Sequence, residues 1–232
     1  MEQVMEVNFF WKGDKFSYLN RLCVLSHVHV GHKAVMWLSG DRPKSEYWID
    51  DVPGVEIRDA DTIVDVTGFL QAGGNFKTAS SLWRFMFLYE HGGLYCDTDA
   101  MAIKQFPSEE WIISSSIPEE NLSTGVIKAP PGQVVFKNCI SKLKKKWGNV
   151  VVFTNEYEKA YGNTDCTHDH KLFYPFSWKN WNTLFKDTEI PDVYSVHLYH
   201  TMLENAGLVF EKEKYNSNTL IGKMIEKFDW MK

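Results

Sequence analysis

Two aspartates one residue apart, Asp97 and Asp99, are the residues of this sequence best suited to chemistry. They follow a glycine pair at 92–93 and a short apolar stretch at 94–96. In an extended chain, residues i and i+2 point the same way, so both carboxylates can address one point while Thr98 faces elsewhere. Hard oxygen ligands suit Mg²⁺ or Mn²⁺, which commonly join one or two carboxylates to phosphates. The pair is therefore a candidate site for a divalent metal ion that binds a diphosphate.

The elements around the pair must place it at the edge of a sheet. Residues 76–93, FKTASSLWRFMFLYEHGG, predict an amphipathic helix with Thr78 as its N-cap and Gly92 as its stop. The next residues, GLYCDTD, change to an extended pattern, so both aspartates lie at or just beyond the C-terminal end of a strand, where open α/β sheets bind ligands. An isolated pair of this spacing is more often a solvated turn. The ordered helix, glycine pair, strand and acids favour a site.

The preceding residues alternate between strand and helix patterns. A strand is expected at 7–11 (VNFFW), a helix at 18–31 that ends at Gly31, and a second buried strand at 33–39. Two further short strands are expected in VEIRDA and TIVDV, within 55–66. Strand, helix and strand in succession favour an α/β sheet. We expect one α/β domain over residues 1–232, with a mixed central sheet flanked by helices.

Composition narrows the class of protein. The chain has 232 residues, 44% of them hydrophobic, and a net charge of −5, which disfavours a binder of duplex nucleic acid. It shows no apolar stretch long enough to span a bilayer and no basic leader with a cleavage site, so we expect a cytoplasmic protein. The cysteines are widely spaced, which disfavours a zinc site and gives no disulfide framework. They are Cys23, Cys96, Cys139 and Cys166.

Residues 80–100, SSLWRFMFLYEHGGLYCDTDA, resemble the sugar-binding region of glycosyltransferases with a D-x-D motif. Its usual form is Ser-Asp-x-x-Arg, an apolar helix, then Gly-Gly-x-Tyr-x-Asp-x-Asp. The family includes initiating mannosyltransferases, α-1,4-galactosyltransferases and clostridial glucosylating toxins. The resemblance implies the nucleotide-diphospho-sugar transferase (GT-A) fold. It also implies that residues 1–105 bind the donor and the metal, and that residues 106–232 shape the acceptor side.

The resemblance implies a catalytic and metal-binding set. Asp97 and Asp99 would hold Mn²⁺ or Mg²⁺, and His197, within YSVHLYHTM, would complete the metal site, with His200 as the competing candidate. Imidazole is compatible with Mn²⁺ in such a site. Arg84 would act beside the aspartates by contacting donor hydroxyls or phosphate. The alternative for Arg84 is a salt bridge on the helix surface.

Four further residues are implied to contact the donor, besides Arg84 and Asp97. Trp11 would stack on the nucleobase, or else be a core tryptophan that closes the first strand. Tyr95 lies in the motif, and Asn121 precedes a small-residue segment expected beside the sugar. Ser81 stands where the family carries aspartate, so it offers one hydrogen bond but no charge. That departure puts donor preference and activity in doubt.

The sequence gives weaker signals for the residues that would bind the acceptor. Trp178 and Trp181, in YPFSWKNWNTLF, could stack on a carbohydrate acceptor, although core packing explains most tryptophans. His200 is a further acceptor-side candidate. A glycan, a lipid-linked sugar and a small molecule are all open as acceptors. The cluster DCTHDH at 165–170 is interpreted as a solvated loop.

These assignments predict a metal-dependent retaining glycosyltransferase. A sugar would move from a nucleoside diphosphate donor, with a UDP-sugar as the first expectation, to a hydroxyl acceptor, and the metal would stabilise the leaving diphosphate. The sequence shows no evident nucleophile for a covalent double displacement, so front-face transfer with retention is expected. A bacterium or a virus is the expected source.

Two other functions stay in view. A degenerate, non-catalytic nucleotide-sugar or carbohydrate-binding module is consistent with Ser81 in place of an acid. A phosphotransferase of the haloacid-dehalogenase type also uses D-x-D after a strand. That class places the motif at its first strand and wants Thr or Val where this chain has Met101.

Overall fold

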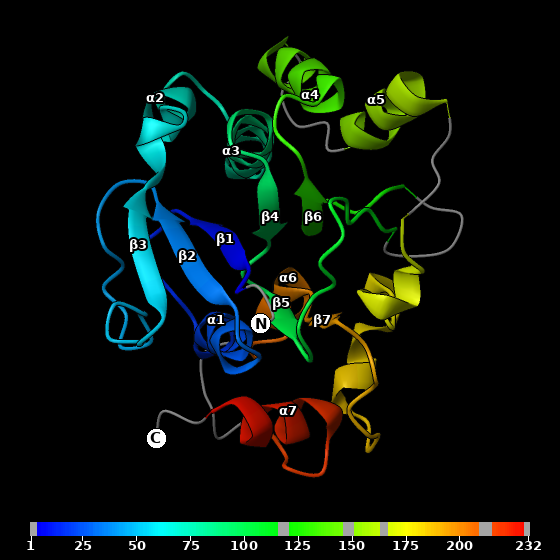
Figure 1. Ribbon diagram of the computed structural model, residues 1–232. Helices are drawn as coiled ribbons and strands as arrows, with labels where there is room; N and C mark the ends of the chain where they lie inside the picture. The colour runs from blue at the N-terminus through cyan, green and yellow to red at the C-terminus, as the bar shows by residue number, and fades with distance from the viewer. Residues whose placement is uncertain (1–3, 116–120, 146–150, 163–166, 209–214, 230–232) are drawn as a thin grey trace.

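A five-stranded mixed sheet forms the centre of the molecule (Figure 1). The computed structural model describes residues 4–115, 121–145, 151–162, 167–208 and 215–229. The strands follow the order β3-β2-β1-β4-β6; β1 to β4 run parallel to their neighbours, and β6 is antiparallel to β4. They are β1 (Glu6–Trp11), β2 (Lys33–Leu38), β3 (Val55–Asp59), β4 (Gly93–Cys96) and β6 (Val126–Ala129).

Helices cover both faces of this sheet (Figure 1). One face packs on α1 (Tyr18–His29) and α7 (Leu220–Phe228), and the other packs on the helices that follow β3 and β6. Side chains alternate along β1, so Phe9 joins the first core cluster and Phe10 the second. The helices of the second face are α2 (Val66–Gln71), α3 (Phe76–Glu90), α4 (Val134–Lys145) and α5 (Val152–Tyr161).

A second, two-stranded sheet adjoins the C-terminal end of β4. It pairs β5 (Ala100–Ala102) with β7 (Ser195–His197) in antiparallel register, so Ala100 lies opposite His197. The chain between β4 and β5 is a turn closed by the Ala100 N–H, which donates to the Asp97 carbonyl at 3.0 Å. The small sheet therefore brings a late strand against the aspartate pair.

Short helices complete the described chain. They are η1 (Ala60–Thr62), η2 (His170–Leu172), η3 (Trp178–Phe185) and α6 (His200–Asn205). Within the ranges given above, none of the helices has both the length and the apolar character needed to cross a bilayer.

Most of the expected elements are confirmed, and two local predictions are wrong. The N-cap of α3 is Asn75, whose side chain accepts from the Thr78 N–H at 2.9 Å, so Thr78 lies inside the helix rather than at its cap. The stretch TIVDV forms no strand. There Asp65 accepts the Gly68 N–H at 2.7 Å and starts α2, because local capping outweighs the β-branched composition.

Candidate metal and donor site

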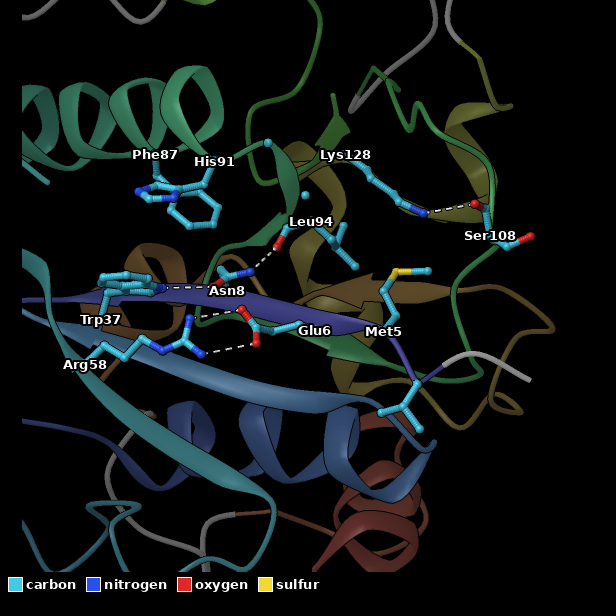
Figure 2. Close-up of a pocket in the computed structure, with 13 residues that line it drawn as sticks. Met5, Glu6, Asn8, Trp37, Arg58, Phe87, His91, Leu94, Ser108 and Lys128 are labelled. Atoms are coloured by element: carbon cyan, nitrogen blue, oxygen red, sulfur yellow. Dashed lines mark hydrogen bonds and ion pairs between the residues drawn. The ribbon is translucent and has the colours of Figure 1, made fainter. Parts of the chain in front are cut away.

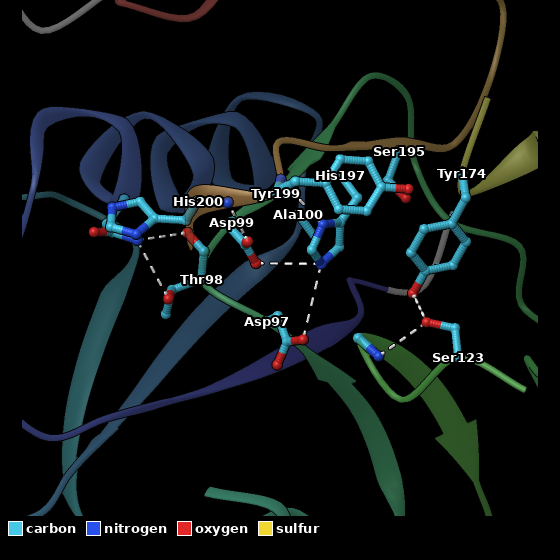
Figure 3. Close-up of polar contacts among 12 residues, drawn as sticks. Asp97, Thr98, Asp99, Ala100, Ser123, Tyr174, Ser195, His197, Tyr199 and His200 are labelled. Carbon is cyan, nitrogen blue, oxygen red and sulfur yellow. Dashed lines mark hydrogen bonds and ion pairs between the residues drawn. The ribbon is translucent and has the colours of Figure 1, made fainter. Parts of the chain in front are cut away.

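Asp97, Asp99 and His197 meet just beyond the C-terminal end of β4 (Figure 3). One ligand atom from each lies within 4.8 Å of the other two. Asp97 is anchored by its N–H, which donates to the Gly125 carbonyl at 2.7 Å. Thr98 lies beside α1, where the Asn20 side chain donates to its carbonyl at 3.2 Å and to its hydroxyl at 3.4 Å. Both acids join one cluster as expected, but the expectation that Thr98 faces elsewhere is not met, because a turn replaces the extended chain and Thr98 lines the same cavity as the aspartates.

The Asp97 carboxylate is held by two side chains of the motif. Its Oδ1 accepts from the Arg84 guanidinium at 2.5 Å and from the Tyr95 hydroxyl at 2.7 Å. Arg84 also donates to Tyr95 at 3.1 Å and is only 5% exposed. Burial opposes ionisation of Asp97, but the Arg84 charge and hydrogen bonds from His197 and Tyr95 outweigh it, so the pKa of this carboxyl lies below its usual value. Asp97 is thus a carboxylate near neutral pH, with Oδ2 left for a ligand.

Asp99 joins the turn to the late strand. Its Oδ1 lies 3.2 Å from His197 Nε2, and its Oδ2 accepts the His200 backbone N–H at 3.0 Å. The Leu198 N–H donates to the Asp99 carbonyl at 2.8 Å. Burial would lower the pKa of His197, but the charge of Asp99 and contact with Asp97 outweigh it and raise that pKa. The carboxylates and the imidazole therefore form one electrostatic unit.

Two tyrosine rings flank the His197 imidazole (Figure 3). The ring centroid of Tyr174 lies 5.5 Å away and that of Tyr199 lies 4.8 Å away. The Ser123 hydroxyl donates to the Tyr174 hydroxyl at 2.6 Å, and the Tyr199 hydroxyl donates to the Phe176 carbonyl at 2.7 Å. Both rings are thus anchored at their polar ends, so the orientation of the imidazole is fixed by its neighbours.

The residues present fit a divalent cation. Two carboxylates and an imidazole are a donor set that suits Mn²⁺, and Mg²⁺ also takes such carboxylates. A Cβ placed at Gly125 would lie 3.0 Å from Asp97 Oδ2 and 3.1 Å from His197 Nε2. The glycine therefore leaves open the space beside these two ligand atoms, which any larger residue would fill.

A cavity of about 480 Å³ adjoins the aspartates, and it contains most of the predicted donor residues. The predicted site residues that line the cavity are Trp11, Ser81, Arg84, Tyr95, Asp97, Asp99 and His200. Thr124, in the small-residue segment expected beside the sugar, also lines it. Residues not predicted as donor contacts line it too, and these are Phe10, Asn20, Phe76, Lys77, Ser80, Thr98 and Thr201. Helical spacing from Arg84 could have indicated Lys77 and Ser80, but no sequence signal marks Asn20 or Thr201.

For two of the predicted donor residues, Trp11 and Ser81, the structure bears on which role each can have. Trp11 lines the cavity and also packs edge-on against Phe16, at 4.9 Å between ring centroids. It is therefore both a packing residue and an available ring. Ser81 is buried, and its hydroxyl donates to the Lys77 carbonyl at 3.0 Å, so its proton is used by its own helix. Ser81 can still accept a hydrogen bond from a ligand.

Four predicted residues do not line this cavity. His197 belongs to the cluster with the aspartates but not to the cavity lining. Asn121 is exposed and lies outside the lining. Trp178 is 47% exposed, and Trp181 packs edge-on against Phe185 at 5.9 Å, both on η3. Of the cluster at 165–170, the first two residues lie outside the described ranges, and Asp169 caps η2.

A second cavity, of about 510 Å³, opens at the opposite edge of the sheet (Figure 2). It is lined by the beginnings of β1 and β4 and by the end of α3, including Glu6, Leu94 and His91. Its Arg58 is already paired with Glu6 at 3.1 Å and with Glu56 at 2.7 Å. No group of metal-ligand side chains faces it within the described residues. Among the described residues, the group of possible metal ligands therefore lies at the aspartate end.

Comparisons with known proteins agree with this geometry. The family model described as glycosyltransferase sugar-binding region containing DXD motif matches residues 32–119, and that of the alpha 1,4-glycosyltransferase conserved region matches residues 138–228. A human alpha-1,4-N-acetylglucosaminyltransferase is 22% identical, over 64% of this chain and 49% of the relative. The chain thus spans about half the length of that curated relative.

Solved structures with the same architecture are also glycosyltransferases. The PaToxG glycosyltransferase superposes with a TM-score of 0.56 at 15% identity, over 69% of this chain and 70% of the other. GlyE of Streptococcus pneumoniae TIGR4 superposes with a TM-score of 0.51 at 13% identity, over 100% of this chain and 61% of the other. These likenesses identify the fold as GT-A. In fold, and in sequence over residues 32–119 and 138–228, the chain is therefore similar to glycosyltransferases, including those whose sugar-binding region contains the DXD motif.

Proposed function

We propose that this chain transfers a sugar from a nucleoside diphosphate donor to a hydroxyl acceptor, with Mn²⁺ or Mg²⁺ as cofactor and a UDP-sugar as the first donor to test. The observation that carries the proposal is the meeting of Asp97, Asp99 and His197 beside a cavity of about 480 Å³. A volume of that order suits a ligand of nucleotide-sugar size. The cavity also presents Trp11, whose ring is available to a nucleobase.

Each residue at the aspartate end has a role in this proposal. Asp97, Asp99 and His197 would hold the cation, which when bound supplies positive charge to the leaving diphosphate. Arg84 keeps Asp97 ionised and oriented through its contact at 2.5 Å. Tyr95, between them, donates to the same carboxylate oxygen. The three-residue network orients the motif before any ligand arrives.

Retention of anomeric configuration is the stereochemistry that we propose. The cavity lining contains no carboxylates other than Asp97 and Asp99, and both are committed to the cluster described above. That lining thus offers no separate carboxylate to form a covalent glycosyl intermediate, which favours front-face transfer. An NMR time course of the product that showed the inverted anomer would rule retention out.

The acceptor is proposed to approach from residues 106–232, where Trp178 is the exposed aromatic side chain named above. A carbohydrate acceptor would stack on such a ring. A glycan, a lipid-linked sugar and a small metabolite are the acceptor classes to screen. Replacing Trp178 by Ala should raise the KM for acceptor while leaving donor hydrolysis unchanged, if this face is used.

The first experiment measures nucleotide release from a panel of UDP- and GDP-sugars with and without Mn²⁺. Wild type is compared with Asp97→Asn, Asp99→Asn and the control Asp192→Asn, whose carboxylate is exposed and pairs with Lys104. We expect metal-dependent release from one donor, lost in the first two variants and kept in the control. Release that survives both substitutions would contradict the proposed site.

A non-catalytic binding module is the second candidate, and Ser81 is the observation that favours it. Its hydroxyl donates to the Lys77 carbonyl and it brings no charge to the cavity. Calorimetry would distinguish the two functions. Metal-dependent binding of a nucleoside diphosphate, without turnover of any donor, would support the module.

A further inference from the structure

One face of α3 forms a wall of the donor cavity. Lys77, Ser81 and Arg84 lie at positions i, i+4 and i+7, which fall on the same side of a helix, and all three line the cavity. The hydrogen bond from Ser81 to the Lys77 carbonyl runs along this stripe. Arg84 lies at the aspartate end of the stripe and Lys77 lies in the first turn of the helix.

The charge of Lys77 is not compensated by any of the described residues. In the described part of the chain its ammonium group forms neither an ion pair nor a hydrogen bond, and the residue is exposed. Lys33, Lys104 and Lys223, by contrast, each have a carboxylate partner. The other cation of the cavity lining, Arg84, is committed to Asp97 and Tyr95. Lys77 is therefore the cation that the lining leaves available for a ligand.

The position of Lys77 is electrostatically unfavourable without a ligand. The N-terminus of a helix carries partial positive charge, so a cation in the first turn is disfavoured and an anion is favoured there. The helix has 15 residues, and its first turn contains no acidic side chain. A local rule broken without a compensating contact points to a functional position. An anion beside Lys77 would satisfy both the ammonium group and the helix N-terminus.

Charge balance at the site identifies the anion. A divalent cation would be cancelled by the carboxylates of Asp97 and Asp99, and Arg84 then adds one positive charge. A nucleoside diphosphate ester carries two negative charges, so one of them stays uncompensated at the metal centre. Lys77 is on the same cavity wall and supplies the missing charge.

We propose that Lys77 is a donor-binding residue that contacts the diphosphate and stabilises the negative charge that develops on it as the sugar leaves. This inference rests on the proposed transferase function and adds a residue to it. The anion is the diphosphate rather than an acidic group on the sugar, because the two negative charges of the diphosphate ester already match the positive charges of Arg84 and Lys77. Lys77 would therefore act on every nucleoside diphosphate donor, whatever its sugar.

Binding of products tests this without any need for turnover. The dissociation constants of UDP, GDP, uridine and guanosine are measured by calorimetry in the presence of Mn²⁺, at low and high salt. Lys77→Gln removes the charge and Lys77→Arg keeps it. Lys137→Gln is the matched control, because Lys137 is an exposed lysine of α4, away from the cavity lining.

We expect Lys77→Gln to weaken binding of the preferred nucleoside diphosphate roughly tenfold and to leave its nucleoside unchanged, as for loss of one charge-assisted contact. The loss should shrink at high salt. Lys77→Arg and Lys137→Gln should bind as wild type does. Unchanged diphosphate affinity in Lys77→Gln, an equal loss for the nucleoside, or no binding of either diphosphate by wild type would overturn the proposal.

The outcomes separate this inference from the transferase function. If wild type binds the diphosphate through Lys77 but releases nucleotide from no sugar donor, the role of Lys77 stands and catalysis is refuted. If donors are turned over and Lys77→Gln matches wild type in both binding and kcat/KM, the transferase stands and Lys77 has no role in it. A loss confined to donors with an acidic sugar would also overturn the diphosphate assignment.

Discussion

Tyr199 adopts a backbone conformation that few side chains other than glycine and asparagine take. Its φ is +54°, and it is the one non-glycine residue with positive φ in the described chain. This left-handed turn lets His197 face the aspartates while the His200 N–H reaches Asp99 at 3.0 Å. Strain of this kind costs roughly 1–3 kcal/mol and is concentrated at functional sites. We therefore propose that Tyr199 positions His197 and the His200 N–H around Asp99.

Replacing Tyr199 by Ala should weaken Mn²⁺ binding roughly 10- to 100-fold, the range typical of residues that orient metal ligands. The ring beside His197 is lost, and so is the hydroxyl contact with Phe176. Tyr199→Phe keeps the ring and should lose less affinity. Manganese titration followed by EPR measures this, with Tyr161→Ala as a control on exposed α5 surface. Equal affinities in all variants would argue against positioning.

The sequence predicts the part of the site that is local in the chain. Asp97 and Asp99 could be paired from their spacing, and their strand-end position followed from the change in hydrophobic period. His197 was reached only through family resemblance, because nothing local links it to the aspartates. The contributions of Asn20, Thr201 and Tyr199 could not be predicted. They depend on packing between distant segments and on a left-handed tyrosine that has no sequence signature.

A buried histidine of helix α1 contacts β5, the strand that follows the aspartate turn. His27 Nε2 donates to the Ala100 carbonyl at 3.0 Å, and its ring packs edge-on against Phe9 and Phe106. Burial lowers the pKa of His27 to about 3, with the nearby His32 adding to the effect and the carbonyl contact opposing it. The imidazole is therefore neutral in the folded protein, and α1 depends on that state for its contact with β5.

Acid should destabilise the fold through this helix. The folded pKa of His27 lies below its unfolded value near 6.5, so the unfolded chain binds the extra proton. The neutral His27 side chain makes its full contribution to the free energy of unfolding above about pH 6.5. That contribution falls by about 1.4 kcal/mol per pH unit as the pH falls toward the folded pKa. Denaturant unfolding at pH 7.5 and 5 measures this. His27→Gln, which can still donate to the carbonyl, should show a smaller pH dependence; an identical one would contradict the role of His27.

The longer elements were predictable and the shortest were not. Strands β1 and β2 and helix α3 have clear periodic patterns, and the strand-helix-strand order anticipates their parallel pairing. Strands β5 and β7 have three residues each and pair across a long stretch of chain. No propensity over so few residues decides such pairing, since burial between the surrounding elements selects it.

At the scale of the whole molecule, metal binding should join distant parts of the chain. Asp97 and Asp99 follow β4, whereas His197 ends β7 and the cavity lining extends to Thr201. A cation bound only in the folded state stabilises it by about 2.7 kcal/mol at one hundred times its Kd. For a chain of this size, that corresponds to a rise in Tm of roughly 5–10 °C.

Thermal unfolding with and without Mn²⁺ tests this coupling. The rise should be present in wild type and in Asp192→Asn, and it should be absent or much reduced in Asp97→Asn and His197→Ala. An unchanged rise in both site variants would show that the ion binds elsewhere. The same scan with Mg²⁺ would compare the two candidate cofactors directly.

The pairing of β5 with β7 also bears on how such a protein can change over generations. His197 reaches the aspartates because it lies opposite Ala100 in that register, and a slip by one residue would turn its imidazole to the other side. Gly125 and Tyr174, which lie between the two strands in sequence, also contact the cluster. Surface turns elsewhere along that path do not enter the register, so we expect that they can gain or lose residues while the pairing of two short strands keeps Asp97, Asp99 and His197 together.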